Sequence, residues 1–97
     1  MTGRYRLSPA ARADLDEIWN YSAENWGATR ADKYVRDLAG ALEKLACGKR
    51  RGRACDHIRP GYFRYPCQSH VFFYKIDGKN LDVIRILHQR MDFTRRL

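Results

Sequence analysis

Residues 69–92 constrain the fold of this 97-residue chain more than any other segment. Two runs rich in β-branched and aromatic residues, 69–76 and 81–88, flank the turn sequence Asp77-Gly78-Lys79-Asn80. Such runs on either side of a short turn that contains glycine are typical of a β-hairpin. With Gly78-Lys79 as the loop, apolar and oppositely charged residues face each other across the strands. The predicted pairs are Ile76–Leu81, Lys75–Asp82, Tyr74–Val83 and Phe73–Ile84.

Both faces of this predicted hairpin are apolar. The first face carries Phe72, Tyr74, Ile76, Leu81 and Val83, and the second carries Val71, Phe73, Ile84 and Ile86. A half-solvated antiparallel sheet would show polar residues at alternate positions, so this hairpin needs cover on both sides. We expect the chain's own helices to cover one face. Two alternatives remain for the other face: loops and long side chains of the same chain, or a partner protein.

The residues before the hairpin predict one strand and two helices. Residues 4–7 alternate like a short edge strand, and Ser8-Pro9 is a helix start, with Ser as the N-cap. Gly27 is suited to end this helix in the left-handed cap conformation. A second helix is expected from residue 28 to about residue 47, with Gly40 allowing close approach to the first helix. The predicted core positions are Ala11, Leu15, Ile18, Trp19 and Ser22 on the first helix, and Ala31, Tyr34, Val35, Leu38, Leu42 and Leu45 on the second.

The remaining segments complete a two-layer α+β fold. Residues 54–59 and 62–67 are expected to form short strands, separated by Pro60-Gly61, and residues 89–97 show no periodicity. The predicted architecture is an N-terminal strand and an antiparallel helical hairpin, packed on a mostly antiparallel sheet of three to four strands. Because the sequence shows no repeat, linker or second unit, residues 1–97 are expected to form a single domain.

The formal net charge of +8 lies in the second half of the chain. Residues 1–46 contain as many acids as bases, whereas residues 47–97 contain twelve Lys/Arg and four Asp/Glu. A one-sided basic field implies an anionic partner, either nucleic acid or an acidic protein segment. The loop at residues 49–53 is either a solvated connector or a phosphate-binding patch.

Several functional classes are excluded by pattern. No apolar run is long enough to span a bilayer and no signal peptide is visible, so we expect a cytoplasmic protein with no membrane partner. Three cysteines without a Cys-x-x-Cys pair indicate neither a disulfide framework nor a zinc site, and no cofactor or metal is expected. The acids of the first half are expected to face solvent.

The types of residue present in the second half of the chain leave RNA cleavage open as a function. Cleavage of RNA by its own 2′-hydroxyl needs a base, an acid and a cation beside the phosphate. The second half offers such side chains: His57, Arg59, Tyr62, Arg64, His70, Arg85 and His88. A lone histidine such as His88 is more often a hydrogen-bonded structural residue than a catalyst.

The sequence resembles the ParE toxins of the RelE/ParE superfamily over nearly its whole length. Residues 5–21 resemble the first strand and helix of that family, and Trp26-Gly27 resembles its interhelical turn. Residues 59–64 and 83–92 are similar to its sheet. The resemblance implies the toxin of a type II toxin–antitoxin system, which inhibits DNA gyrase and is neutralised by a ParD-like antitoxin. It also implies a hetero-oligomeric complex that binds operator DNA through the antitoxin.

The same superfamily contains the RelE ribosome-dependent mRNA endonucleases, which are the alternative function. RelE-type toxins carry an arginine early in the penultimate strand, a second arginine after the last strand, and a tyrosine near the C-terminus. The matching positions here are Val71, Met91 and Leu97. The resemblance therefore implies a protein without catalytic residues, although His88 keeps some similarity to a histidine of other family nucleases.

Two groups of residues are predicted to contact the partners. The candidates for antitoxin binding are polar residues beside the apolar sheet surface: Arg59, Tyr62, Arg64 and Arg85. The candidates for gyrase poisoning lie in a tail that we expect to be exposed and not needed for the core: His88, Arg90, Met91, Asp92, Arg95 and Arg96. A third hypothesis is a plain nucleic-acid-binding module that uses the loop at residues 49–53.

Overall fold

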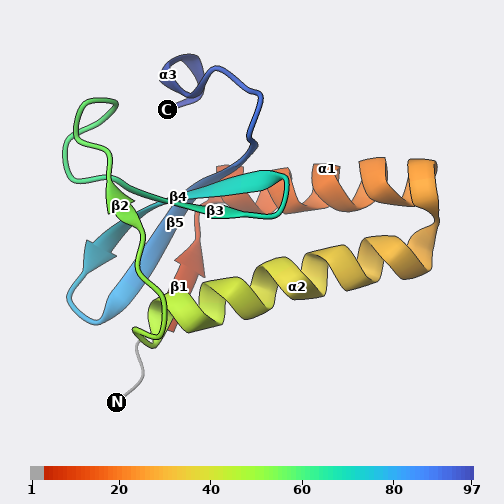
Figure 1. Cartoon of the computed structure of the whole chain (residues 1–97), viewed down its shortest axis with the longest axis horizontal. Helices are drawn as coiled ribbons and strands as arrows, with labels where there is room; N and C mark the ends of the chain where they lie inside the picture. The colour runs from red at the N-terminus through yellow and green to blue at the C-terminus, as the bar shows by residue number, and fades with distance from the viewer. Residues whose placement is uncertain (1–3) are drawn as a thin grey trace.

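A five-stranded sheet with the order β1-β5-β4-β3-β2 forms the centre of the computed structural model, which describes residues 4–97 (Figure 1). β1 is parallel to β5, and the other neighbouring strands are antiparallel. The strands are β1 (Arg4–Leu7), β2 (Arg53–Ala54), β3 (Phe63–Cys67), β4 (His70–Asp77) and β5 (Asn80–His88). The helices are α1 (Pro9–Trp26), α2 (Ala28–Ala46) and α3 (Phe93–Arg96). The predicted α+β fold is confirmed: the N-terminal strand and the four strands that follow the helical hairpin join in one sheet.

The helical hairpin begins and turns at the predicted residues. Ser8 is the N-cap of α1, and its Oγ accepts the Ala11 N–H at 2.9 Å. Gly27 separates α1 from α2 with φ 93° and ψ 161°. The positive φ agrees with the prediction, but the ψ value is extended, in a region that is essentially restricted to glycine. Gly40 was expected to allow close helix approach, and this is wrong, because a Cβ placed there would meet no atom within 4 Å.

The β4–β5 hairpin has the predicted register next to its turn and a different register farther on. Three predicted pairs are confirmed: Ile76–Leu81, Lys75–Asp82 and Tyr74–Val83. Beyond them a β-bulge places Phe73 opposite Arg85 and not Ile84. One extra residue in a strand reverses the faces of all the residues that follow it. Ile86 therefore pairs with Phe72 on the helix side, and its predicted place beside Val71 and Phe73 is wrong.

Two hydrophobic cores lie on the two faces of the sheet. The larger core joins the helices to the sheet and contains Ala11, Ile18, Leu38, Leu42, Leu45, Phe72, Tyr74, Leu81, Val83 and Ile86. The second core contains Cys55, Val71, Phe73 and Leu87, and it is covered by Ile58, Tyr62, Phe93 and Leu97. Of the two alternatives for the second face, the chain's own segments provide the cover.

The cover of the second face corrects two predictions. The tail was expected to be unnecessary for the core, but the Phe93 ring packs edge-on against Phe73 with a centroid distance of 4.8 Å. Residues 54–59 were expected to form a strand, yet only Arg53–Ala54 pairs as β2. The N–H groups of Ile58 and Arg59 both bond to the Cys55 carbonyl, and this turn folds Ile58 onto the second core.

Asp14 is the clearest departure from the sequence-based expectation. It was predicted to face solvent with the other acids, but only 7 % of its surface is exposed. Its carboxylate accepts hydrogen bonds from Arg85 Nε and Nη2, both at 2.8 Å, and from the Ile86 N–H at 2.9 Å. Arg85 Nη1 also donates to the Arg96 carbonyl at 3.1 Å. One ion pair thus ties α1, β5 and α3 together.

We expect Asp14→Asn to lower the free energy of unfolding by about 2–4 kcal/mol, because a carboxamide cannot accept all three bonds and leaves Arg85 without its counter-charge. Urea denaturation monitored by circular dichroism measures this loss. Asp16→Asn, on the exposed side of the same helix, is the matched control and should change stability by less than about 0.5 kcal/mol. Equal effects of the two substitutions would contradict a special role for Asp14.

Candidate functional site

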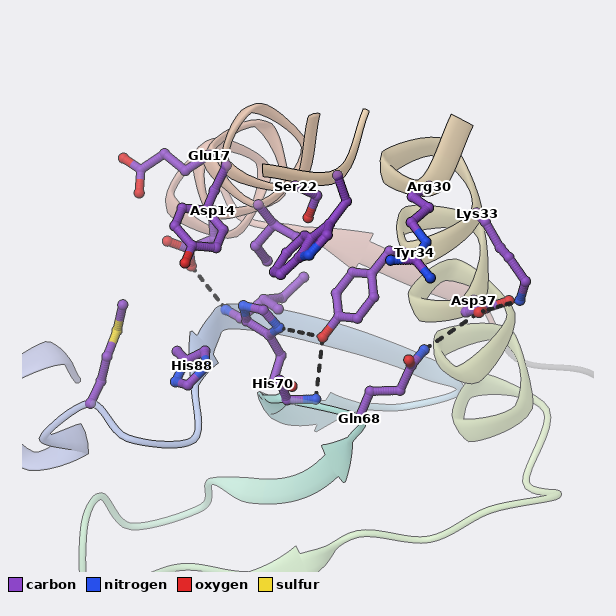
Figure 2. A pocket seen from close by; sticks show the side chains of 16 residues that line it. Asp14, Glu17, Ser22, Arg30, Lys33, Tyr34, Asp37, Gln68, His70 and His88 are labelled. Carbon is purple, nitrogen blue, oxygen red and sulfur yellow. Dashed lines mark hydrogen bonds and ion pairs between the residues drawn. The ribbon is translucent and has the colours of Figure 1, made fainter. Parts of the chain in front are cut away.

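A groove of about 690 Å³ runs between the helical hairpin and the ends of β4 and β5 (Figure 2). Side chains from four segments line it. They are Asp14, Glu17, Ile18, Tyr21, Ser22 and Trp26 of α1; Arg30, Lys33, Tyr34 and Asp37 of α2; Gln68, Ser69 and His70 at the start of β4; and Ile86, His88 and Met91 from β5 and the tail. The groove brings together residues that are separated by most of the chain.

A hydrogen-bonded chain of polar groups lies on the groove floor, marked by dashed lines in Figure 2. The Tyr34 hydroxyl accepts the Ser69 N–H at 3.2 Å and lies 2.7 Å from His70 Nδ1. Because a hydroxyl can both donate and accept hydrogen bonds, this contact is compatible with either neutral tautomer of the His70 ring.

Burial and a neighbouring histidine keep His70 neutral. Burial of the ring, with a contribution from His88, lowers the pKa of His70 from 6.5 to about 4. The two imidazole rings meet edge-on with centroids 5.3 Å apart. His88 Nδ1 accepts the Arg90 N–H at 3.2 Å, which leaves its Nε2 as the ring atom available to a ligand. At neutral pH, His70 provides neither a positive charge nor a strong base.

The groove is lined by two exposed aromatic rings of α1 and by charged side chains of α2. Tyr21 and Trp26 are 62 % and 56 % exposed and pack edge-on at 5.9 Å between ring centroids. Arg30 and Lys33 lie on the α2 side of the groove, where Lys33 pairs with Asp37 at 3.1 Å. Exposed aromatic side chains beside a groove are typical of protein-interaction sites. The exposure of these two rings could not be predicted from the sequence, because aromatic residues at helical spacing look like ordinary core positions.

The predicted nuclease residues do not converge on one site. His70 and His88 share the groove, whereas Tyr62 packs on the second core. His57 is exposed in the turn after β2. The residues at the three RelE-type catalytic positions are apolar: Val71 is buried in the second core, Leu97 packs against it, and Met91 lies at the groove. This arrangement provides no cation or phenol at those positions.

The four residues predicted to bind the antitoxin differ in the contacts that their side chains make within the chain. Arg85 is bound to Asp14, and Arg59 Nε donates to the Leu97 carbonyl at 2.9 Å. Tyr62 covers the second core, with the Lys75 ammonium 5.7 Å from its ring centroid. Within residues 4–97, Arg64 makes no side-chain hydrogen bond or ion pair, and it is the one anchor not committed to internal contacts.

The predicted gyrase-contacting residues cluster around the tail. Arg90, Met91, Asp92, Arg95 and Arg96 are exposed, and His88 is half-buried in the groove. Asp92 is the N-cap of α3 and accepts the Thr94 N–H at 3.1 Å, so it also shapes the tail.

Among residues 4–97, no group of three His, Cys, Asp or Glu side chains is placed to hold a metal ion. No described helix combines the length and apolarity required to cross a bilayer.

The depressed pKa of His70 predicts a dependence of stability on pH. Below pH 6.5 the unfolded chain binds a proton at His70 that the folded chain does not bind until about pH 4, so acidification through this window favours unfolding. His70→Gln keeps an acceptor for Tyr34 but does not titrate. We expect the wild type to lose more stability than this variant between pH 6.5 and pH 4, by at most about 1.4 kcal/mol per pH unit. Urea denaturation across this pH range measures the free energy of unfolding of both proteins. If the two free energies changed in parallel with pH, the prediction would be refuted.

Comparisons with known proteins agree with this fold. The sequence model of the family described as "ParE toxin of type II toxin-antitoxin system, parDE" matches residues 5–93. Toxin ParE1 of Mycobacterium tuberculosis is 49 % identical over 98 residues, which cover all of both chains. A solved chain of the chromosomal ParDE system of P. aeruginosa superposes with a TM-score of 0.76 at 23 % identity, over 91 % of this chain and 96 % of that one.

A second structural neighbour shows that the fold extends beyond the ParE toxins. A chain of the toxin–antitoxin complex RelBE2 from Mycobacterium tuberculosis superposes with a TM-score of 0.65 at 18 % identity, over 94 % of this chain and 95 % of that one. Structural likeness at such identities establishes the fold alone. The family model and the full-length relative provide the finer distinction, and they show that this chain belongs to the ParE toxin family of type II toxin–antitoxin systems.

Proposed function

We propose that this chain is a toxin that inhibits DNA gyrase by binding it, and that a ParD-like antitoxin neutralises it. Family membership supports the toxin role. The observation that favours binding over RNA cleavage is the apolar character of the three RelE-type positions. Val71 and Leu97 pack in or on the second core, so neither position can present a charged group or a phenol to a substrate.

The tail provides the surface that we assign to gyrase. Phe93 and Leu97 hold it against the second core, while Arg59 and Arg85 donate to the carbonyls of Leu97 and Arg96. These contacts leave the side chains of Arg90, Arg95 and Arg96 exposed on an ordered backbone. A surface that is already ordered loses less conformational entropy on binding than a flexible tail.

Charge reversal tests this surface better than truncation does, since a truncated tail would also uncover the second core. The double variant Arg95→Glu/Arg96→Glu keeps the backbone carbonyl that Arg85 requires. In a supercoiling and cleavage assay with purified gyrase and plasmid DNA, the wild type should abolish supercoiling and produce linear DNA. We expect the double variant to need at least about tenfold more protein for the same effect, a loss of about 1.4 kcal/mol of binding.

The control is Arg12→Glu/Arg36→Glu, two exposed arginines on the helices with the same change in charge. It should inhibit gyrase like the wild type. Full activity of the Arg95→Glu/Arg96→Glu variant would refute the assignment of the tail, and intact supercoiling with the folded wild type would refute gyrase as the target.

The second candidate function, ribosome-dependent mRNA cleavage, is favoured by one observation: His70 and His88 lie in the same groove. A parallel reaction with ribosomes translating a message tests it. A cut message with untouched plasmid, together with loss of cleavage in His88→Ala, would replace the gyrase proposal.

The groove is our candidate for antitoxin binding, with Arg64 as a second contact on the opposite face of the sheet. The apolar second face was the earlier candidate, but the chain covers it with its own turn and tail. The exposed pair Tyr21 and Trp26 offers the apolar anchor that an amphipathic segment of the antitoxin requires. Arg64 lies opposite Phe73 in the sheet and has no partner of its own among the described residues.

Calorimetric titration with a ParD-like antitoxin separates these two contacts. We expect Trp26→Ser to weaken the complex at least about tenfold, as is typical of an aromatic hot spot. Arg64→Glu should also weaken it. Ile76→Ser, which alters a side chain that is 58 % exposed at the β4–β5 turn, is the matched control and should have little effect. Unchanged affinity in Trp26→Ser would remove the groove from the proposal, and unchanged affinity in Arg64→Glu would remove that residue.

A further inference from the structure

A group of uncompensated cations lies at the end of the molecule opposite the α1–α2 turn. The basic surface consists of Arg4, Lys44, Lys49, Arg50, Arg51 and Arg53. Figure 1 shows the loop that carries most of these residues leaving α2 beside the start of β1. Arg4, Lys44 and Lys49 line one shallow cavity of about 640 Å³, in which Glu43 is the acidic lining residue.

None of these six cations has an ionic partner in the part of the chain that the structure describes. By contrast, Arg6 pairs with Asp77 and Asp82, and Arg85 pairs with Asp14. Uncompensated like charges at short separation repel each other and raise the free energy of the folded state. An anion that binds there relieves this repulsion.

The register of the sheet adds a second unfavourable contact. Arg53 of β2 lies directly opposite Arg64 of β3, and neither side chain has an acidic partner among the described residues. Like charges directly opposite each other in an antiparallel pair are destabilising. Two facing guanidinium groups can instead share an anion that accepts hydrogen bonds from both.

The basic loop is hydrogen-bonded to the rest of the fold at both of its ends. At its start, the N–H groups of Lys49 and Arg50 both bond to the Lys44 carbonyl. At its end, the Gly52 N–H donates to the buried Tyr74 hydroxyl at 2.9 Å. A Cβ at Gly52 would collide with that hydroxyl and with the Arg64 carbonyl, so only glycine allows the loop to dock this closely. The cations are therefore presented on an ordered backbone.

We propose that the basic surface binds the phosphate backbone of duplex DNA, as a contact made by the toxin itself. The exposed large hydrophobic residues of the described chain, Tyr21, Trp26, Ile76 and Met91, all lie outside it. Protein interfaces are built around apolar anchors and contain few lysines, whereas interfaces with nucleic acid are strongly positive. Tyr5 lines the cavity but is half-buried against the core, and no described residue of this surface is an exposed aromatic. This favours a duplex over a single strand, whose bases require exposed stacking partners.

The choice of DNA over RNA rests on the proposed function, since gyrase acts on duplex DNA. In Figure 1 the start of the basic loop and α3 lie at opposite edges of the molecule. The toxin can therefore contact gyrase through its tail and DNA through its loop at the same time. Recognition through phosphates alone is independent of base sequence.

Fluorescence anisotropy with the isolated full chain and a labelled duplex of about 20 base pairs tests the proposal in the absence of gyrase. Arg50→Glu/Arg51→Glu is compared with Arg12→Glu/Arg36→Glu. Each reversal changes the charge by two, so both variants carry a formal net charge of +4 in place of +8. We expect the wild type to bind with an affinity that falls steeply with salt. The loop variant should lose at least about tenfold in affinity, and its salt slope should decrease by about 2, while the control loses much less.

Three results would overturn the proposal. They are the absence of wild-type binding at about 50 mM salt, equal losses in the two variants, and tighter binding to an RNA duplex or to polyglutamate than to DNA. If the loop variant does not fold, as judged by circular dichroism, Arg50→Gln/Arg51→Gln takes its place with the same expected direction. Gyrase is absent from this binding assay, so a negative result would refute DNA binding by the basic surface without refuting gyrase inhibition. The supercoiling assay tests gyrase inhibition separately.

Discussion

The ion pair between Asp14 and Arg85 is the contact on which the arrangement of this fold depends. β1 pairs with β5 only at residues 80–83, so the remainder of β5 would otherwise be an open sheet edge. Side chains near the start of α1 close that edge: Ser8 Oγ donates to the Ile84 carbonyl, and Asp14 accepts the Ile86 N–H. An open edge invites pairing with other chains. The same carboxylate thus fixes the position of α1 and protects the sheet.

Local sequence signals predicted β1, α1, α2, β3 and the β4–β5 hairpin, but not β2, α3 or the contacts between the elements. The Ser8-Pro9 start, the Gly27 turn and the pairs next to Gly78 depend on neighbouring residues, and all of them were predictable. The bulge near Ile84 and the burial of Asp14 depend on Arg85 meeting a helix 71 residues earlier in the chain, and no local pattern encodes that meeting. The same reason explains the groove, whose lining comes from four segments.

The three surfaces that we propose as binding sites differ in physical character. The groove offers exposed aromatic rings, the tail offers arginines on a packed segment, and the basic surface offers cations without apolar anchors. The tail and the basic loop were candidates from the sequence because clusters of charged residues can be recognised without tertiary contacts. The groove could not be predicted in this way, because its lining residues come together only in the fold.

The cover of the second core by Phe93 and Leu97 has a genetic consequence. The last residues of the chain are structural, since they shield Val71, Phe73 and Leu87 from water. A stop codon a few positions early would expose this apolar surface and mark the product for proteolysis. We therefore expect frameshifts at the 3′ end of the gene to lower the amount of the protein in the cell, whereas missense changes at exposed positions leave the cover of the second core intact.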